Sequence, residues 1–420
     1  MSWKKKYEEN WGRLGMRYKT YTMEDALEAI IDYRGKTPKK SEKGIPTLSA
    51  KSVKNNHIDY DSCYYISSDE YKRFMVRGLP QIGDVLLTTE APLGMVAQLD
   101  RNDVGIAQRL LTLRGKQGIL DNEYLLYYLQ SPIGQALLRA RETGTTVTGI
   151  KQSEFRKIQI DIPDIENQRK IGGILRGLDD KIAVNNSINK NLEQQALALF
   201  KQYFMDYVPY GGVAPAEWRE VSLDDVCTKI TDGSHYSPTD SPDSPYPMYS
   251  VKDMETYGFN SSSCKHITKE DFCKLQKNDC IPLLNDILVA KDGSYLKEIF
   301  ICSEQKDEAI LSSIAIFRPD TQIILPEILL YLLKQPSVRK DVGDNYVSGS
   351  ALPRIVLKDF KKYRFMLPTV EEQKKIGSVL HAIRIQIKTN VYEIHSLSFL
   401  RDALLPKLMS GELDVSAIDL

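Results

Sequence analysis

An internal repeat with an offset of 205 residues constrains this 420-residue chain more than any other feature. Residues 163–182 and 368–387 are identical at eight of twenty positions, and both begin with the pattern Pro-x-x-Glu-x-Gln. The similarity continues upstream, where residues 143–150 align with residues 348–355 at the same offset. A period this long indicates a duplicated domain and argues against a solenoid of short repeats.

Each repeat begins with short hydrophobic runs that are broken by Gly, Pro, Asn and Asp. The segments Asp84–Thr89 and Asp286–Ala290 are rich in Val, Leu and Ile and end at turns, which predicts buried strands. The segments Glu123–Leu129 and Glu327–Leu333 predict helices that stop before a proline. We therefore expect an α+β fold class with two similar mixed α/β globules of about 145 residues each.

A long helix is predicted after each globule, because apolar or Asn residues recur there in alternating steps of four and three, as in a coiled coil. In the first helix these positions are Ile171, Leu175, Leu178, Ile182, Asn185, Asn189, Leu192, Ala196, Leu199 and Tyr203. In the second they are Ile376, Leu380, Ile383, Ile387, Asn390, Ile394, Leu397, Arg401, Leu404 and Leu408. Since one chain supplies two matching seams, we expect the helices to form an antiparallel coiled coil with each other.

An Asn residue occupies the same seam position in both predicted helices, at Asn185 and Asn390. In an antiparallel pair, Asn390 would face Asn189, and Asn185 would face the region of Ile394. A buried seam Asn costs stability but fixes the register of a coiled coil. The alternative is that these Asn residues face solvent and that the two helices pack on something else.

These patterns predict a division of the chain into six segments. They are a basic N-terminal segment at 1–21, a first globule at 22–162, a first long helix at 163–210, a second globule at 211–368, a second long helix at 369–413 and a tail at 414–420.

The formal charge of the whole chain is zero, with 56 basic and 56 acidic residues. Only residues 1–21 are basic as a segment, with six Lys or Arg against two Glu, whereas residues 217–368 carry 19 basic and 23 acidic residues. Affinity for nucleic acid would therefore have to come from local clusters of cations or from a partner protein.

The sequence carries no recognisable catalytic or cofactor motif. Gly35-Lys36-Thr37 resembles the end of a P-loop, but Ile30 stands where the first Gly is required. No Gly-x-Gly-x-x-Gly follows a predicted strand, and no Asn/Asp-Pro-Pro-aromatic motif of an amino-methyltransferase is present. We expect a non-catalytic protein that binds no cofactor.

The six cysteines form no Cys-x-x-Cys pair. Zinc binding by Cys264, His266, Cys273 and Cys280 is conceivable but fits no common spacing, so no metal is expected. No apolar run is long enough to cross a bilayer, and residues 1–20 lack the apolar core of a secretory signal. A cytoplasmic protein with reduced thiols is the expectation.

At this point the chain resembles a known family, the DNA specificity (S) subunits of type I restriction-modification systems. Residues 32–38 and 215–223 resemble the openings of that family's two target-recognition domains. Residues 199–207 and 404–413 resemble the ends of its two conserved helices, and the Pro-x-x-Glu-x-Gln blocks resemble their beginnings. The motifs occur in the family's order over nearly the whole chain.

The resemblance implies that each recognition domain reads one half of a bipartite site in double-stranded DNA. It implies that the paired helices set the spacer between the half-sites and dock two adenine methyltransferase subunits. It further implies that restriction/translocase subunits join this core and that the chain itself is a non-catalytic subunit of a restriction system.

Base edges in the major groove are read by basic and small polar side chains on loops and helix ends. In the first globule such candidates for DNA binding are Arg34, Lys36, Lys39, Lys40, Lys51, Thr145, Thr146 and Lys151. In the second globule they are Ser234, His235, Tyr236, Lys252, Lys291, Ser294, Ser350 and Arg354. For each of them the alternative is an ordinary solvated side chain.

Two other classes of protein compete with this interpretation. A stand-alone nuclease or methyltransferase with a cryptic site would methylate or cleave DNA without partners. A coiled-coil adaptor that joins two proteins would give no site-specific DNA protection.

Overall fold

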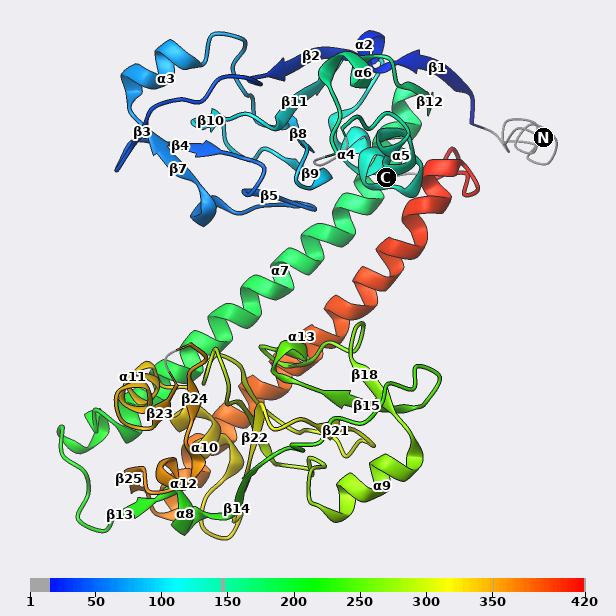
Figure 1. The fold of residues 1–420 in the computed structure, drawn as a ribbon. Helices are drawn as coiled ribbons and strands as arrows, with labels where there is room; N and C mark the ends of the chain where they lie inside the picture. The colour runs from blue at the N-terminus through cyan, green and yellow to red at the C-terminus, as the bar shows by residue number, and fades with distance from the viewer. Residues whose placement is uncertain (1–15, 145–147, 350, 419–420) are drawn as a thin grey trace. The chain divides into compact units, whose positions relative to one another are not determined.

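The computed structural model describes residues 16–144, 148–349 and 351–418 (Figure 1). The described chain divides into two compact units. Unit 1 comprises residues up to Ala183 together with those from Ile394 onward, and unit 2 comprises Val184–Glu393. Each unit contains one globule and a part of both long helices, so the repeat is expressed as two mixed α/β folds, as the sequence predicts.

Unit 1 contains two four-stranded sheets. The first is antiparallel in the order β2 (Leu27–Asp32), β11 (Leu110–Gly115), β8 (Val85–Thr89) and β9 (Leu93–Gln98). The second has the order β10 (Gly105–Ile106), β4 (Ile45–Leu48), β7 (Tyr64–Ile66) and β3 (Lys40–Ser41), in which β10 and β4 are parallel. Two-stranded pairs are β1 (Tyr18–Thr22) with β12 (Gln159–Pro163) and β5 (Val53–Lys54) with β6 (His57–Ile58). The helices of the globule are α2 (Met23–Ala26), η1 (Tyr60–Ser62), α3 (Ser68–Phe74), α4 (Asn122–Gln130), α5 (Pro132–Arg139) and α6 (Gln152–Arg156).

Unit 2 repeats this plan. Its larger sheet is β14 (Cys227–Asp232), β22 (Ile314–Pro319), β19 (Ile287–Ala290) and β20 (Ile299–Ile301), and its smaller sheet is β18 (Lys265–Ile267), β15 (Tyr246–Tyr249) and β21 (Ala309–Ile310). The two-stranded pairs are β13 (Arg219–Ser222) with β25 (Arg364–Leu367), β16 (Met254–Glu255) with β17 (Gly258–Phe259), and β23 (Val347–Ser348) with β24 (Arg354–Ile355). The helices are η2 (Val208–Tyr210), α8 (Leu223–Val226), η3 (Val251–Asp253), α9 (Lys269–Lys277), α10 (Pro326–Leu333), α11 (Pro336–Asn345) and α12 (Leu357–Phe360).

The same buried ion pair crosses the larger sheet of each unit. The carboxylate of Asp84 accepts two hydrogen bonds from the Arg114 guanidinium at 2.7 and 2.8 Å. In unit 2 the Asp286 carboxylate accepts two from Arg318, both at 2.8 Å. Both aspartates are almost completely buried and begin the predicted central strands. The duplication has therefore kept a polar contact inside each core.

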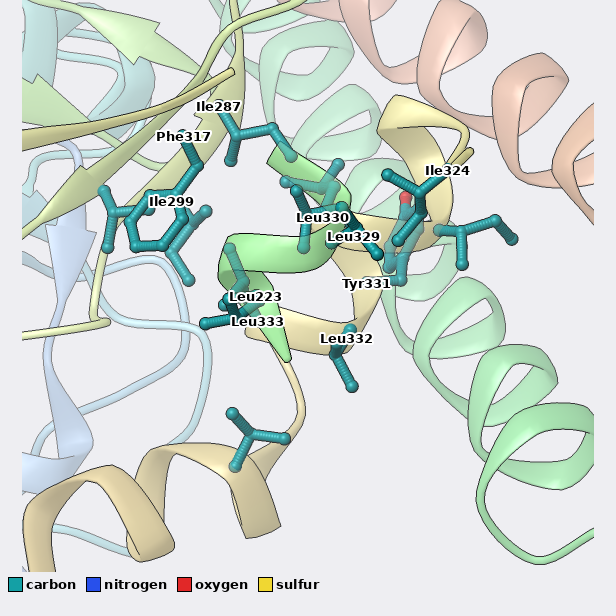
Figure 2. Packing of buried hydrophobic residues seen from close by; sticks show 14 of the residues in the cluster. Leu223, Ile287, Ile299, Phe317, Ile324, Leu329, Leu330, Tyr331, Leu332 and Leu333 are labelled. Carbon is teal, nitrogen blue, oxygen red and sulfur yellow. The ribbon is translucent and has the colours of Figure 1, made fainter. Parts of the chain in front are cut away.

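Each unit has its own hydrophobic core between the larger sheet and the helices that follow it. Figure 2 shows this core in unit 2, where Leu329, Leu330 and Leu333 of α10 belong to one cluster with Phe317 and Ile287 of the sheet, and Leu333 lies beside Leu223 of α8. In unit 1 the corresponding helix α4 buries Tyr124–Leu129 in the same way. A helix that is apolar all round is expected only where it is enclosed by protein.

A buried glutamine joins the start of each long helix to its globule. Gln168 donates to the carbonyl oxygens of Pro163 and Ile119, both at 2.8 Å, and accepts from the backbone N–H of Asp121 at 2.9 Å. Gln373 repeats all three bonds in unit 2, with Pro368, Ile323 and Leu325. The repeated Pro-x-x-Glu-x-Gln motif is therefore a hydrogen-bonded junction between helix and globule.

The long helices are α7 (Ile165–Phe204) and α13 (Val370–Ser410). They are shorter than the predicted segments 163–210 and 369–413. Asp164 and Thr369 precede the helices, and their side chains accept backbone N–H groups of the first turns, as N-caps do. After Phe204 the chain turns through Tyr207, which has a left-handed φ of 52°, into the separate 3-10 turn η2.

The two helices run antiparallel to each other within each unit. In unit 1, the Arg401 guanidinium of α13 donates to the Asp179 carboxylate of α7 at 2.8 Å. Nearer the N-terminus of α7, the Lys170 ammonium donates to the carbonyl oxygen of Ser416, which follows α13. In unit 2, Asn185 contacts Glu393, and Asn189 contacts Asn390. The residue numbers of the contacts on α13 again fall as those on α7 rise, as they do in an antiparallel pair. The expected contact of Asn390 with Asn189 is thereby confirmed.

The positions chosen from the heptad pattern are the buried or half-buried ones. On α7 these are Ile171, Leu175, Leu178, Ile182, Asn185, Leu192 and Leu199, and on α13 they are Ile376, Leu380, Ile383, Ile387, Asn390, Ile394, Leu397 and Leu404. Outside the pattern, Val184 and Ile385 are exposed, whereas Phe200 and Phe204 near the end of α7 are buried in the core of unit 2. The coiled-coil period therefore identifies the inner face of each helix.

Candidate nucleic-acid interface

Three loops that carry candidate DNA-binding residues converge at one edge of the larger sheet in unit 1. The first loop follows β2, the second follows β8, and the third is described at residues 143–144 and 148–151. The Arg34 guanidinium donates to the carbonyl oxygen of Ile150 at 2.8 Å, and the Ile150 N–H donates to the carbonyl oxygen of Thr89 at 2.9 Å. Residues that lie far apart in the sequence thus form one surface at the ends of β2 and β8.

The equivalent loops converge in unit 2, after β14, after β19 and around the β23–β24 hairpin. The Ile355 N–H donates to the carbonyl oxygen of Lys291 at 3.0 Å, and the Gly293 N–H donates to that of Pro353 at 2.7 Å. The Lys291 ammonium lies 2.5 Å from the Asp232 carboxylate at the end of β14. The two units therefore present corresponding three-loop surfaces, which we call loop surface 1 and loop surface 2.

The backbone after β14 is fixed by close packing. A Cβ atom on Gly233 would lie 2.3 Å from the carbonyl oxygen of Ile310, so only glycine fits there. The next residue, Ser234, is buried, and its hydroxyl donates to the carbonyl oxygen of Tyr236 at 2.6 Å. Local packing therefore turns the chain so that His235 and Tyr236 project outward, with Tyr236 63% exposed.

Most candidates of unit 1 are exposed. Lys36, Lys39 and Lys40 follow β2, and Lys151 lies at the N-cap of α6; all four are exposed, whereas Arg34 is half-buried. Lys51 is also exposed but lies in the turn between β4 and β5. Among the described residues, this turn makes no backbone hydrogen bond to the three loops. Thr145 and Thr146 lie outside the described residues.

The candidates of unit 2 divide into exposed and engaged side chains. His235, Tyr236, Lys252, Ser294 and Arg354 are exposed. Ser234 and Lys291 are buried. Ser234 is hydrogen-bonded to Tyr236, and Lys291 forms an ion pair with Asp232. Ser350 lies outside the described residues.

Sequence reasoning missed three residues that shape these surfaces. Arg77 donates to the carbonyl oxygens of Asp32 and Arg34 at 2.8 and 3.2 Å, and no local pattern signals a contact over more than 40 residues. Asp232 is not among the candidates, yet it holds Lys291. Lys43 is exposed and continues the basic run from Lys36 to Lys40, so that run was the signal that could have found it.

Two negative findings concern the described residues only. No cluster of three or more His, Cys, Asp or Glu side chains in the described ranges is arranged to hold a metal ion. No described helix combines the length and hydrophobicity needed to span a membrane.

Comparison with known proteins gives the same assignment along nearly the whole chain. The sequence profile of the family described as "Type I restriction modification DNA specificity domain" matches twice, at residues 17–194 and 215–394. The type I restriction enzyme MjaIX specificity subunit of Methanocaldococcus jannaschii is 26% identical over 401 residues, covering 89% of this chain and 88% of that protein. The type I restriction enzyme HindI specificity subunit of Haemophilus influenzae is 24% identical, covering 79% and 86%.

A solved structure supports the fold. The crystal structure of the type I restriction-modification system S subunit from M. genitalium superposes with a TM-score of 0.57 at 16% identity, covering 94% of this chain and 96% of that one. With the two profile matches spanning well over half of the sequence, the chain belongs to the family of type I restriction-modification DNA specificity proteins and carries two copies of the specificity domain.

Proposed function

We propose that this protein is the DNA-reading subunit of a type I restriction-modification complex in which each unit recognises one half of a bipartite site. The observation that carries the proposal is the presence of corresponding loop surfaces in two units that differ in their loop side chains. Residues 22–162 and 211–368 are the two target-recognition domains in this proposal. Since the side chains differ between the units, the two half-sites differ in sequence.

The candidate residues divide into those placed to read bases and those placed to hold phosphates. Arg34 and Lys151 in unit 1, and His235 and Arg354 in unit 2, lie near the convergence of the loops and suit base edges. Lysines on the surrounding segments suit phosphate oxygens, which position a protein on DNA without reading its sequence. Lys291 supports its loop through Asp232 and contributes little direct contact.

We further propose that α7 and α13 dock adenine methyltransferase subunits and that restriction/translocase subunits join this core. In unit 2 both helices expose apolar side chains outside their seam, including Ile188, Ile385 and Tyr392. In unit 1 the segment of α13 exposes Phe399, which is 79% accessible, and Leu400. Apolar residues displayed on a helix that already has a partner on its other face favour protein docking.

Reconstitution tests the proposal. The full chain, combined with methyltransferase subunits, should methylate adenines within one split motif when unmethylated DNA is supplied and modified adenines are mapped. The joint variant Arg34→Ala with Lys151→Ala should relax one half of that motif, and His235→Ala with Arg354→Ala should relax the other. Absence of a discrete split motif would sink the proposal, and methylation by the purified chain alone would favour the stand-alone enzyme.

The spacer role has a separate test. Seven extra helical residues add about 10.5 Å, which corresponds to about three base pairs of DNA. Inserting one heptad into α7 and one into α13 should lengthen the unspecified spacer by that amount while both half-sites persist. Insertion into α7 alone should disturb the pairing of the helices. An effect confined to one half-site would show that the helices do not act as a pair.

A further inference from the structure

Loop surface 1 and loop surface 2 differ sharply in charge. Residues 33–44, which follow β2, contain five Lys or Arg and one Glu. The corresponding residues 233–245, which follow β14, contain no Lys or Arg and two Asp. We propose that residues 34–43, the basic segment, anchor the complex on the phosphate backbone of duplex DNA, so that unit 1 supplies most of the salt-dependent affinity. This inference rests on the function proposed above.

The basic segment is held in place by neighbouring side chains. Arg77 donates to the carbonyl oxygens of Asp32 and Arg34, and the carboxylate of Glu70 on α3 accepts the backbone N–H of Lys39 at 2.8 Å. At the far end, a Cβ atom on Gly44, which has a φ of +139°, would lie 2.2 Å from the carbonyl oxygen of Ile66. A segment fixed at both ends presents its charges with less entropy to lose on binding.

The charges of the basic segment are not neutralised within the described part of the chain. There, no carboxylate lies within 4.0 Å of a side-chain nitrogen of Lys36, Lys39, Lys40 or Lys43, and all four residues are exposed. Arg34 points its guanidinium at a carbonyl oxygen, which satisfies a donor and leaves the positive charge in place. Ten residues extend over at most about 30 to 35 Å, close to one turn of B-form DNA.

Several cations of unit 2, unlike the lysines of the basic segment, have ion-pair partners within the fold. Lys291 is paired with Asp232, and Lys229 and Arg318 both contact Asp279. Lys265 lies against residues 233–245, where its ammonium donates to the Ser237 hydroxyl and the Pro238 carbonyl oxygen, each at 2.7 Å. These cations support the fold of unit 2 and are not displayed for phosphates as those of the basic segment are.

The size of the effect follows from counterion release. Each phosphate neutralised by a lysine contributes about 0.9 to the slope of log affinity against log salt concentration. Removing four lysines should therefore lower the slope by up to about 3.6. Between 50 and 200 mM salt that slope corresponds to about a 150-fold change in affinity.

The test uses the reconstituted complex with methyltransferase subunits and a labelled duplex of about 40 base pairs of arbitrary sequence. One variant carries Lys36→Gln, Lys39→Gln, Lys40→Gln and Lys43→Gln. The matched control removes four exposed lysines from unit 2, as Lys252→Gln, Lys269→Gln, Lys277→Gln and Lys358→Gln. The unit 1 variant should lose about three to four from the salt slope, and the control should lose less than half as much. Unchanged thermal midpoints would show that both variants fold.

Two outcomes would overturn the inference. One is an equal or larger loss of salt slope in the unit 2 control. The other is a unit 1 variant that binds DNA normally but no longer retains the methyltransferase subunits, which would make the basic segment a protein-binding surface. Failure of the proposed function is a different result, namely that the unaltered complex methylates no bipartite motif.

Discussion

The side-chain amide of Asn390 donates a hydrogen bond to the side-chain oxygen of Asn189 at 2.8 Å, and both residues are almost completely buried. Asn185, the repeat counterpart of Asn390, instead donates to the carboxylate of Glu393 at 2.8 Å. The two contacts lie between α7 and α13 in unit 2 and fix one antiparallel register. A duplicated position has thus acquired two different partners.

The first prediction concerns this polar contact. Asn390→Leu should lower the free energy of unfolding by about 1–3 kcal/mol, because Asn189 would keep a buried side chain without its partner. The double variant with Asn189→Leu should recover most of that loss, since two leucines pack well in a seam. Urea unfolding of the full chain measures both, and a double variant no more stable than the single one contradicts the argument.

The second prediction concerns the buried ion pairs of the larger sheets. Arg114→Leu and Arg318→Leu should each cost about 3–5 kcal/mol, because a fully buried Asp84 or Asp286 carboxylate would lose its bidentate partner. The exposed pair of Arg101 with Asp103 provides the control, and Arg101→Leu should cost less than about 1 kcal/mol. Similar losses in buried and exposed variants, measured by urea unfolding, would refute the prediction.

The third prediction concerns pH. Hydrogen bonds from Lys388 and Tyr392, both at 2.6 Å, lower the pKa of Glu304 to about 2 from an ordinary value of 4.5. A lowered pKa stabilises the fold above the unfolded value and loses that contribution as the pH falls from 4.5 toward 2. The thermal midpoints of wild type and Glu304→Gln should therefore differ at pH 6, approach each other below pH 4.5 and converge only near pH 2.

The size of that difference is small, because Glu304 is exposed and salt screens its charge. We expect less than about 1 kcal/mol at pH 6 and a further decrease in 0.5 M salt. A difference that grows on acidification would show that the carboxylate contributes in its neutral form.

The fourth prediction concerns thiol reactivity. Cys273 is exposed, whereas burial raises the pKa of Cys227 to about 12 and also raises that of the buried Cys302. Since only the thiolate reacts with iodoacetamide, Cys273 should be modified first at pH 8, and Cys227 and Cys302 only after unfolding. Peptide mass spectrometry over time gives the order, and early modification of Cys302 would contradict the burial argument.

The fifth prediction concerns the exposed aromatic residue of α13 in unit 1. Phe399→Ser should leave the thermal midpoint of the free chain nearly unchanged but reduce the amount of methyltransferase subunit that copurifies with it. Leu79→Ser replaces a similarly exposed apolar residue of the globule and serves as the control. Equal retention of the subunit by both variants would remove Phe399 from the docking surface.

The repeat and its periods were sufficient to predict much of the fold. The heptads of α7 and α13 identified which faces of the helices are buried, and the Val-rich and Leu-rich runs located β8, β19, α4 and α10 to within a residue or two. Such patterns can be recognised in the sequence because buried residues recur at the period of the element, every two residues in a strand and every 3.5 residues in a coiled coil. The alignment also predicted the contact of Asn390 with Asn189.

The sequence did not predict which basic side chains of the candidate site form ion pairs, because the partners are distant along the chain. In the sequence, Lys291 and Lys39 are both basic residues in a predicted loop. In the structure, the Asp232 carboxylate neutralises the Lys291 ammonium, whereas the Glu70 carboxylate binds only the backbone N–H of Lys39. Each partner is more than 30 residues away. Sequence alone therefore determined the duplicated fold, the helix seams and the loops of the candidate site. Only the tertiary structure decided which of the candidate cations are ion-paired within the fold, because ion pairing depends on distance in space and not on separation along the chain.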